Sequence, residues 1–247
     1  MSKVFSKDAG KEMNNTISKA LEELRKGNII LVYDAEGREE ETDMVIASEH
    51  VKPETIRTLR KDAGGLICTT VPPHARKCIG IPYMVDVLSH SKGIFPIVDG
   101  LKPNDIPYDT KSSFSLTINH RKTFTGITDR DRALTVSEFS KIVRMTLSCE
   151  NGYASETFAK NFRSPGHVHL LNASDGLTLK RQGHTELATA ITILAGLTPT
   201  ATICEMMGED GYALSKEKAM KYAEENGLVF LEGKEIIEVW RAEESSG

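Results

Sequence analysis

The alternation of apolar and polar positions predicts a chain in which helices and strands alternate. Residues 17–24 carry apolar side chains at helical spacing and Gly27 follows them, which indicates an amphipathic helix that ends at a glycine. The apolar run at residues 29–33 is typical of a buried strand, and a charged loop separates it from a second predicted strand at 44–47. Further strands are predicted at residues 65–69, 113–119, 167–171, 198–204 and 228–231.

Capping residues predict where the helices begin. Thr135 and Glu138 form a capping box, so a helix is expected from Thr135 to about residue 147. Thr185 is the expected N-cap of a mostly apolar helix that reaches residue 195. Ser215 opens a helix that ends before Gly227. Two more helices are predicted at residues 53–61 and 236–240.

The stretch from residue 71 to 112 is rich in Pro and Gly and shows weak periodicity. Long loops of this kind are usually functional or mobile. No linker or repeat divides the chain, so residues 1–247 are predicted to form a single domain of the α+β, or mixed α/β, class with a mixed sheet. Residues 1–12 and 242–247 are predicted to be frayed tails.

Composition narrows the class of protein. Hydrophobic residues make up 39% and charged residues 27% of the chain, which is ordinary for a soluble domain. A net charge of −4 gives no broad basic surface, which argues against nucleic acid as the main partner. No apolar run is long enough to predict a membrane span. Four widely spaced cysteines without a C-x-x-C pair, and the lack of a secretion signal, predict reduced thiols and a cytoplasmic protein.

An acidic segment, REEETD at residues 38–43, lies between two predicted strands and follows Asp34 and Glu36. A solvated turn is the simplest interpretation of such a run. However, a loop that leaves a buried strand is a common place for an active site. Carboxylates are ligands for magnesium or manganese, and they can act as general bases when a neighbour shifts their pKa. Arg38 would keep them ionised or hold an anionic substrate. The spacing leaves open which carboxylates bind a metal.

A second segment, RQGHTE at residues 181–186, precedes the apolar helix. A helix N-terminus offers unpaired N–H groups to a phosphate, and Gly183 lets the backbone approach a ligand closely. Arg181 adds a bidentate donor, and His184 could bind a divalent metal through a neutral ring nitrogen. The alternative is a simple capped helix start with an incidental histidine. The glycine spacing of a Walker loop or a dinucleotide fingerprint is absent.

Three single residues add weaker signals. His167 follows a Pro-Gly turn at the entry of a predicted strand, where an exposed turn histidine is the alternative interpretation. Glu205 ends an otherwise apolar strand, and partial burial there would raise its pKa toward that of a useful acid or base. Cys68 also lies at a strand end, where core packing competes with a role as a site-lining thiol.

Together and in this order, these segments resemble the 3,4-dihydroxy-2-butanone 4-phosphate synthase family of riboflavin biosynthesis, in its stand-alone archaeal form. The resemblance extends from residue 28 to residue 231. It is carried by ILVYD at 30–34, REEETD at 38–43, DAGGLIC at 62–68, FTGIT at 124–128, RSPGHV at 163–168, RQGHTE at 181–186 and TICEMM at 202–207.

The resemblance implies a three-layer α/β/α sandwich and a lyase reaction, in which D-ribulose 5-phosphate becomes L-3,4-dihydroxy-2-butanone 4-phosphate and formate. It also implies Mg²⁺ or Mn²⁺ as cofactor and a homodimer without nucleic acid or membrane partners. The implied metal ligands are Glu39 and His184. The implied substrate contacts are Arg38, Glu39, Asp43, Thr125, Arg181, Gln182, Gly183, His184, Thr185 and Glu205. The implied catalytic residues are His167 and Glu205, with Asp34, Glu41 and Cys68 as secondary positions.

The implied reaction consists of enolisation, loss of water from C1, a skeletal rearrangement and expulsion of C4 as formate. Each step develops charge on an oxygen, which a divalent cation stabilises as a Lewis acid. Several proton transfers require more than one acid–base group, and the reactive intermediates must be kept from water. We therefore expect the acidic segment to act as a lid as well as a metal donor.

Two positions depart from the family pattern. Gly37 stands where an acidic residue commonly precedes the arginine, and Glu40 stands where Gly or Asn is usual, which leaves the local loop geometry open. The cyclohydrolase half of bifunctional relatives is not expected in this chain. Two alternative functions are a different phosphosugar isomerase or aldolase, which would retain all five carbons, and a non-catalytic nucleotide- or RNA-binding module. The low aromatic content of 6% argues against the latter.

Overall fold

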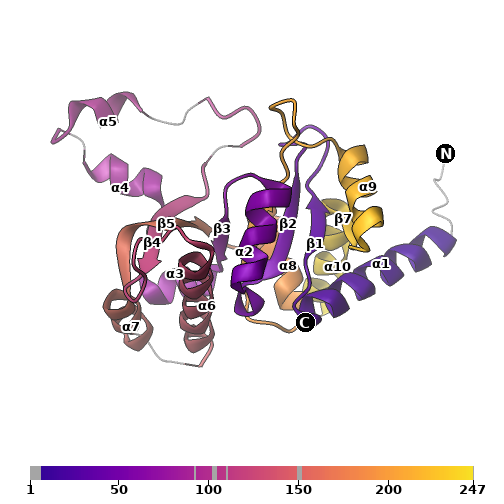
Figure 1. Ribbon diagram of the computed structural model, residues 1–247, viewed down its shortest axis with the longest axis horizontal. Coiled ribbons are helices and arrows are strands. Elements are labelled where there is room, and N and C mark those ends of the chain that lie inside the picture. The colour runs from indigo at the N-terminus through magenta and orange to yellow at the C-terminus, as the bar shows by residue number, and fades with distance from the viewer. Residues whose placement is uncertain (1–6, 92, 102–104, 110, 149–151, 247) are drawn as a thin grey trace.

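A mixed β-sheet forms the centre of the protein (Figure 1). The computed structural model describes residues 7–91, 93–101, 105–109, 111–148 and 152–246, and within them one sheet has seven strands. These are β1 (Ile30–Tyr33), β2 (Thr42–Ala47), β3 (Cys68–Val71), β4 (Phe114–His120), β5 (Phe162–Asn172), β6 (Ala201–Glu205) and β7 (Phe230–Glu232). Their order across the sheet is β4-β5-β3-β6-β2-β1-β7. The β1–β7 and β3–β5 pairs are parallel, and the other neighbours are antiparallel.

Helices cover both faces of the sheet, so successive strand residues enter different cores. In β1, Leu31 packs into one hydrophobic cluster, whereas Ile30 and Val32 pack into the other. The first cluster includes residues of α2 (Pro53–Thr58), α3 (Pro73–Ile79), α6 (Asp129–Thr146), α7 (Tyr153–Asn161) and α9 (Lys216–Asn226). The second includes residues of α1 (Lys7–Lys26), α8 (His184–Leu194) and α10 (Gly233–Ser246). The predicted single-domain, three-layer α/β/α sandwich with a mixed sheet is therefore confirmed.

Two predicted helix starts are wrong, because in each case the N-cap is an earlier residue than the one predicted. Helix α6 begins six residues before Thr135, at Asp129, and the Thr128 hydroxyl accepts the Asp131 N–H at 3.1 Å. The Thr135 hydroxyl instead donates to the Asp131 carbonyl inside the helix. Helix α8 begins at His184, with Gly183 as its N-cap, so Thr185 lies in the first turn rather than at the cap.

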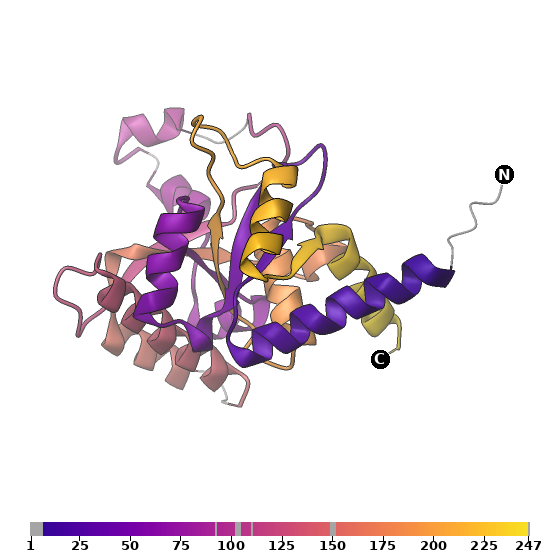
Figure 2. The same cartoon turned by 45° about the vertical axis from the view of Figure 1, so that its right-hand side comes forward.

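Within the described part of the predicted long loop at residues 71–112 lie three short helices, α3, α4 (Met84–His90) and α5 (Pro96–Gly100). Figures 1 and 2 show α4 and α5 standing away from the three layers. We call the described residues between 84 and 113, which include both helices, the arm. Ile94, Phe95 and Ile97 are exposed on this arm. Because the arm does not bury one face against the sheet, its sequence lacks the periodicity that predicts a helix. Helix α7 was also not predicted.

The ends of the chain are helical as far as the structure describes them. Helix α1 begins at Lys7 and α10 extends to Ser246, so both overlap the expected tails, while residues 1–6 and 247 lie outside the described residues. Fraying of residues 1–12 and 242–247 stays a prediction. Among the described residues, no helix combines the length and apolar character needed to cross a membrane.

Phe139 tests the packing of the first core. Its side chain is fully buried and meets the rings of Phe158 and Phe162 edge-on. We predict that Phe139→Ala lowers the free energy of unfolding by about 3–5 kcal/mol, because a large cavity replaces the ring. Urea unfolding followed by circular dichroism measures this change. Tyr212, whose side chain is exposed, is the matched control, and Tyr212→Ala should change the free energy by less than about 0.5 kcal/mol.

Candidate active site

The carboxylate of Asp34 organises the loop between β1 and β2. Asp34 follows β1 directly and is only 2% exposed. One of its oxygens accepts the Glu39 N–H at 3.0 Å and the other accepts the Glu41 N–H at 3.2 Å. The Asp34 N–H also donates to the Glu41 carbonyl at 3.2 Å. Asp34 thereby determines where the acidic side chains on either side of residue 40 point.

Glu40 adopts a left-handed backbone conformation, with φ 59°. Gly and Asn populate this region more readily than other residues, which gives a physical reason for the family preference at this position. The Glu40 side chain is exposed, and its Oε1 accepts the N–H of Gly37, which also has positive φ. Glu40 thus adopts a backbone conformation that Gly or Asn favours, and its side chain adds a local hydrogen bond to the loop.

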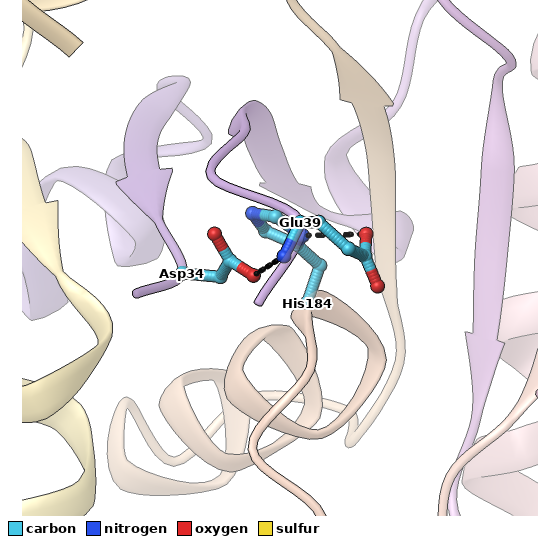
Figure 3. A group of neighbouring side chains, drawn as sticks. All are labelled: Asp34, Glu39 and His184. Atoms are coloured by element: carbon cyan, nitrogen blue, oxygen red, sulfur yellow. Dashed lines mark hydrogen bonds and ion pairs between the residues drawn. The ribbon is translucent and has the colours of Figure 1, made fainter. Parts of the chain in front are cut away.

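His184, at the first position of α8, faces this loop from the next layer (Figure 3). Its Nδ1 lies 3.5 Å from a Glu39 carboxylate oxygen, and its Nε2 lies 3.7 Å from Asp43 Oδ1 and 3.2 Å from the Glu41 carbonyl oxygen. Ligand atoms of Asp34, Glu39 and His184 all lie within 4.8 Å of one another. Segments about 145 residues apart in the chain therefore converge on one point.

This donor set fits a divalent cation. Both oxygens of Asp34 already accept backbone N–H groups, whereas His184 Nδ1 and Asp43 Oδ1 are buried without a hydrogen-bond partner. His184 Nε2 donates to the Glu41 carbonyl, so Nδ1 is the ring nitrogen that faces Glu39. Nδ1 would bind the metal once the metal displaces its proton, which is the usual arrangement of a metal-binding histidine. Glu39 and His184 are thus the members of the cluster best able to hold a metal, with Asp34 supporting the loop.

The electrostatics of the site reflect a high density of buried acids. Burial, together with the charges of Glu205 and Glu39, raises the pKa of Asp43 well above its ordinary value. Burial also raises the pKa of Glu41. Burial alone would lower the pKa of His184, but Asp43 and Glu39 outweigh it and raise that pKa to about 10. The surrounding carboxylates therefore favour a positive charge at the imidazole.

Glu205 enters the site from β6, where it lies opposite Asp43 on β2. Its Oε2 accepts the Leu66 N–H at 2.7 Å, and its carbonyl accepts the Gly65 N–H at 3.0 Å. A Cβ atom at Gly65 would lie 2.5 Å from that Oε2 and 2.6 Å from the carbonyl oxygen. The glycine is needed here because the backbone of the Gly-Gly turn passes directly over Glu205.

Two adjoining cavities share this site. One, of about 200 Å³, is lined by Glu39, Glu41, Asp43, Cys68, His184, Thr185, Glu205 and several residues of the arm. The other, of about 330 Å³, is lined by Arg38, Lys180, Arg181 and Gln182 among others. Asp109, Lys111 and Arg181 contribute to both walls. An acidic, metal-suited chamber thus opens beside a basic one.

The arm supplies site residues that the sequence analysis missed. Tyr108, Asp109, Lys111 and Ser112 line the cavities but come from the stretch with weak periodicity. No role was predicted for Glu186 of the RQGHTE motif, yet it is fully buried and accepts a hydrogen bond from Arg181 Nη1 at 2.6 Å. A charged Asp-Thr-Lys run just before a predicted strand was the available signal for the arm residues.

Cys68 and Gly183 have clear structural positions. Cys68 lines the acidic cavity but is 1% exposed, and burial raises the pKa of its thiol well above the ordinary value. Its thiol is therefore neutral at physiological pH and not an activated nucleophile. At Gly183 a side chain would collide with the guanidinium of Arg181, which folds back over the turn.

His167 and Thr125 lie together, but apart from the metal-suited cluster. Asn119 joins them, since its Oδ1 accepts the His167 N–H at 2.9 Å and its Nδ2 donates to the Thr125 carbonyl at 3.4 Å. Both side chains are exposed, and neither is among the described residues that line the two cavities. Phe124, next to them, is 94% exposed. One chain therefore groups the candidate residues into two separate sets.

Comparison with known proteins agrees with this arrangement of motifs. The family model for 3,4-dihydroxy-2-butanone 4-phosphate synthase matches residues 18–239. The chain belongs to this family. The protein of the same name from Methanothermobacter thermautotrophicus is 53% identical over 223 residues, which cover 90% of this chain and 94% of that protein.

Solved structures share the fold. The crystal structure of the synthase from Candida albicans has a TM-score of 0.67 and 26% identity, covering 90% of this chain and 96% of that one. A synthase in complex with two magnesium ions has a TM-score of 0.68 and 24% identity, covering 89% and 94%. The family pattern at the Gly-Gly turn, the acidic segment and the Gly-His-Thr turn thus stands on a fold that brings these three segments together.

Gly65 tests the close packing around Glu205. We predict that Gly65→Ala lowers the free energy of unfolding by about 1–3 kcal/mol, because the added methyl group forces the Glu205 backbone and carboxylate to move. At Gly100 an added Cβ meets no atom within 4 Å, so Gly100→Ala should change the free energy by less than about 0.5 kcal/mol. Equal effects in urea unfolding would show that the Gly65 contact is not constraining.

Proposed function

We propose that the protein is a lyase that converts D-ribulose 5-phosphate to L-3,4-dihydroxy-2-butanone 4-phosphate and formate. The observation that carries the proposal is the convergence of Glu39 and His184, from a loop and a helix start distant in sequence, beside a basic cavity. Membership of the synthase family supports the reaction. Five substrate carbons divide into four and one, so the atoms balance without an external oxidant.

Glu39 and His184 would hold Mg²⁺ or Mn²⁺. Carboxylate oxygens and a neutral imidazole suit both ions, and the same fold accommodates two magnesium ions in a related synthase. When bound, the cation supplies Lewis-acid stabilisation of the charge that develops on substrate oxygens. Asp34 contributes by holding the N–H groups of Glu39 and Glu41, which keeps the first of these carboxylates turned toward His184.

The basic cavity would bind the phosphate of the substrate. Arg38 and Arg181 offer guanidinium donors, and Gln182, Gly183 and Thr185 surround the start of α8. Since the two cavities share a wall, a phosphorylated sugar can place its phosphate at the arginines and its hydroxyl groups at the acidic chamber. Charge separation between the chambers would thereby orient the substrate.

Proton transfer would involve the buried carboxyl groups. Burial raises the pKa of Asp43, which favours its protonated form and suits it to donate a proton to a substrate oxygen. Glu205 is oriented by the Leu66 N–H and lies opposite Asp43, which places a second acid–base group on the same side of the cavity. Glu41 is a third candidate, and Cys68 would shape the wall as a neutral thiol. The loop carrying Glu39 and Glu41 would exclude water.

The site would be completed by a second copy of the chain in a homodimer. His167 and Thr125 are exposed beside Phe124, outside the cavities of their own chain. An exposed patch that carries two motif residues and a fully exposed phenyl ring is suited to cover the site of a partner. His167 would then serve as an acid–base group across the interface. Action in the cytoplasm stays a prediction.

A different phosphosugar isomerase or aldolase would leave formate unformed, and it has no observation in its favour here. A nucleotide- or RNA-binding module would require a basic surface with stacking aromatics. The cavities instead combine acidic and basic walls, and the family match covers the catalytic segments.

Formate release tests the reaction and the ligands together. We predict that the protein with ribulose 5-phosphate and Mg²⁺ releases one formate per substrate, and that Glu39→Gln or His184→Ala lowers the rate at least about a hundredfold, because each removes a ligand. Glu36→Gln, an exposed carboxylate of the same loop, should stay within about twofold. A folded, Mg²⁺-loaded protein that releases no formate would rule out the synthase reaction.

Mixed dimers test whether His167 acts across an interface. His167→Ala and Glu39→Gln are each expected to be inactive. The two variants are then unfolded together and refolded as an equal mixture. About a quarter of the wild-type formate rate should return, because about half of the dimers are mixed and each mixed dimer has one intact site out of two. A mixture that stays inactive, although size measurements show mixed dimers, would place His167 in the site of its own chain.

A further inference from the structure

Asp109 is the one acidic residue among the described residues that line the basic cavity. The cavity measures about 330 Å³, and four of its lining residues, Arg38, Lys111, Lys180 and Arg181, are cationic. A wall of this charge is suited to an anion. The carboxylate of Asp109 is therefore an exception that requires a reason.

The carboxylate of Asp109 contacts both arginines of the cavity. Arg181 Nε donates directly to Asp109 Oδ2, and Arg38 Nη2 lies 3.7 Å from the same oxygen. The three side chains are largely enclosed, with 11–19% of each exposed. A single carboxylate oxygen thus stands between two guanidinium groups, where an oxygen of a bound phosphate would be expected to lie.

Both arginines have other anchors that do not involve Asp109. Glu186 is fully buried and accepts Arg181 Nη1 at 2.6 Å. Asp34 lies 3.7 Å from Arg38 Nε, and Arg38 Nε and Nη2 are buried with no hydrogen-bond partner. The guanidinium groups are consequently held in place when Asp109 leaves, and they retain donors for another anion.

Asp109 lies in no helix or strand, in the connection between α5 and β4. Pro107 and Tyr108, immediately before it, are exposed. Glu186 and Asp34, in contrast, are tied to α8 and to the end of β1. Unlike Glu186 and Asp34, Asp109 is thus not anchored in a helix or directly at the end of a strand.

We propose that Asp109 occupies the binding position of the substrate's phosphate between the two arginines. An incoming anion displaces it. This role rests on the proposed function for the identity of the anion, although the exchange itself requires only an oxyanion. Binding then replaces one carboxylate–guanidinium contact by another, so part of the intrinsic affinity is spent on expelling Asp109. Asp109 therefore sets how tightly the site holds phosphorylated ligands and releases them.

Inorganic phosphate, titrated into the full-length protein by calorimetry at constant ionic strength, tests the exchange without requiring turnover. We expect Asp109→Asn to bind phosphate on the order of tenfold more tightly than the wild type, because a competing negative charge is gone. The KM for ribulose 5-phosphate should fall in the same direction. Asp109→Ala is the second variant, and it should show the same gain if loss of charge is the cause.

Asp105→Asn is the matched control, since Asp105 is an exposed acid on the same segment and its removal changes the net charge equally. It should leave phosphate affinity within about twofold. Adding Arg181→Gln to Asp109→Asn should abolish the gain. Unchanged or weaker phosphate binding by both Asp109 variants would overturn the proposal and indicate that Asp109 positions the arginines instead. A gain in phosphate affinity in a protein that releases no formate would refute the synthase function and leave the exchange intact.

Discussion

The two hydrogen bonds that Asp34 accepts from the Glu39 and Glu41 N–H groups determine the geometry on which the site depends. A loop of eight residues between two antiparallel strands has many conformations, and a run of glutamates would normally spread toward water. The buried carboxylate selects one of them by binding two backbone donors on either side of residue 40. The left-handed conformation at Glu40 is the local strain that allows both donors to face the same carboxylate.

This arrangement brings negative charge into a place where burial opposes it. Asp34 and Asp43 are almost fully buried, and Glu39, Glu41 and Glu205 stand around the same cavity. The free-energy cost of burying such charges is offset by the backbone donors on Asp34 and by the positive charge that the raised pKa favours at His184. The same negative potential would attract a divalent cation, so the raised pKa values in the site and its capacity for a metal have one origin.

Arg38 and Arg181 supply positive charge beside the acidic cavity. Glu186 and Asp34 bind them from the rigid layers, while Asp109 reaches them from the arm. The two cavities are therefore connected through charge as well as through shared walls. A substrate that engages both cavities would contact the arm and the acidic loop together.

Local pattern was sufficient to predict the strands, most helices and a mixed sheet, and the resemblance carried by the ordered motifs indicated the family and its three-layer fold. Burial on both faces imposes apolar residues that the sequence displays directly, and the motifs REEETD and RQGHTE carry their chemistry in their composition. Helix starts at Asp129 and His184 were misjudged because several candidate caps lie within a few residues, and only packing selects among them. The helices of the arm escaped prediction because they bury no regular face.

The convergence of the site could only be decided by tertiary structure. Glu39 and His184 are 145 residues apart, and their contact follows from the strand order that sets β2 beside β6 and from the layer that brings α8 under the loop. The contact of Asp109 with Arg181, the close passage of Gly65 over Glu205, and the separation of His167 from the cavity have no counterpart in local sequence. The chemistry of each side chain can be read from the sequence, but ion pairs between residues that are distant in the sequence form only once the layers have packed.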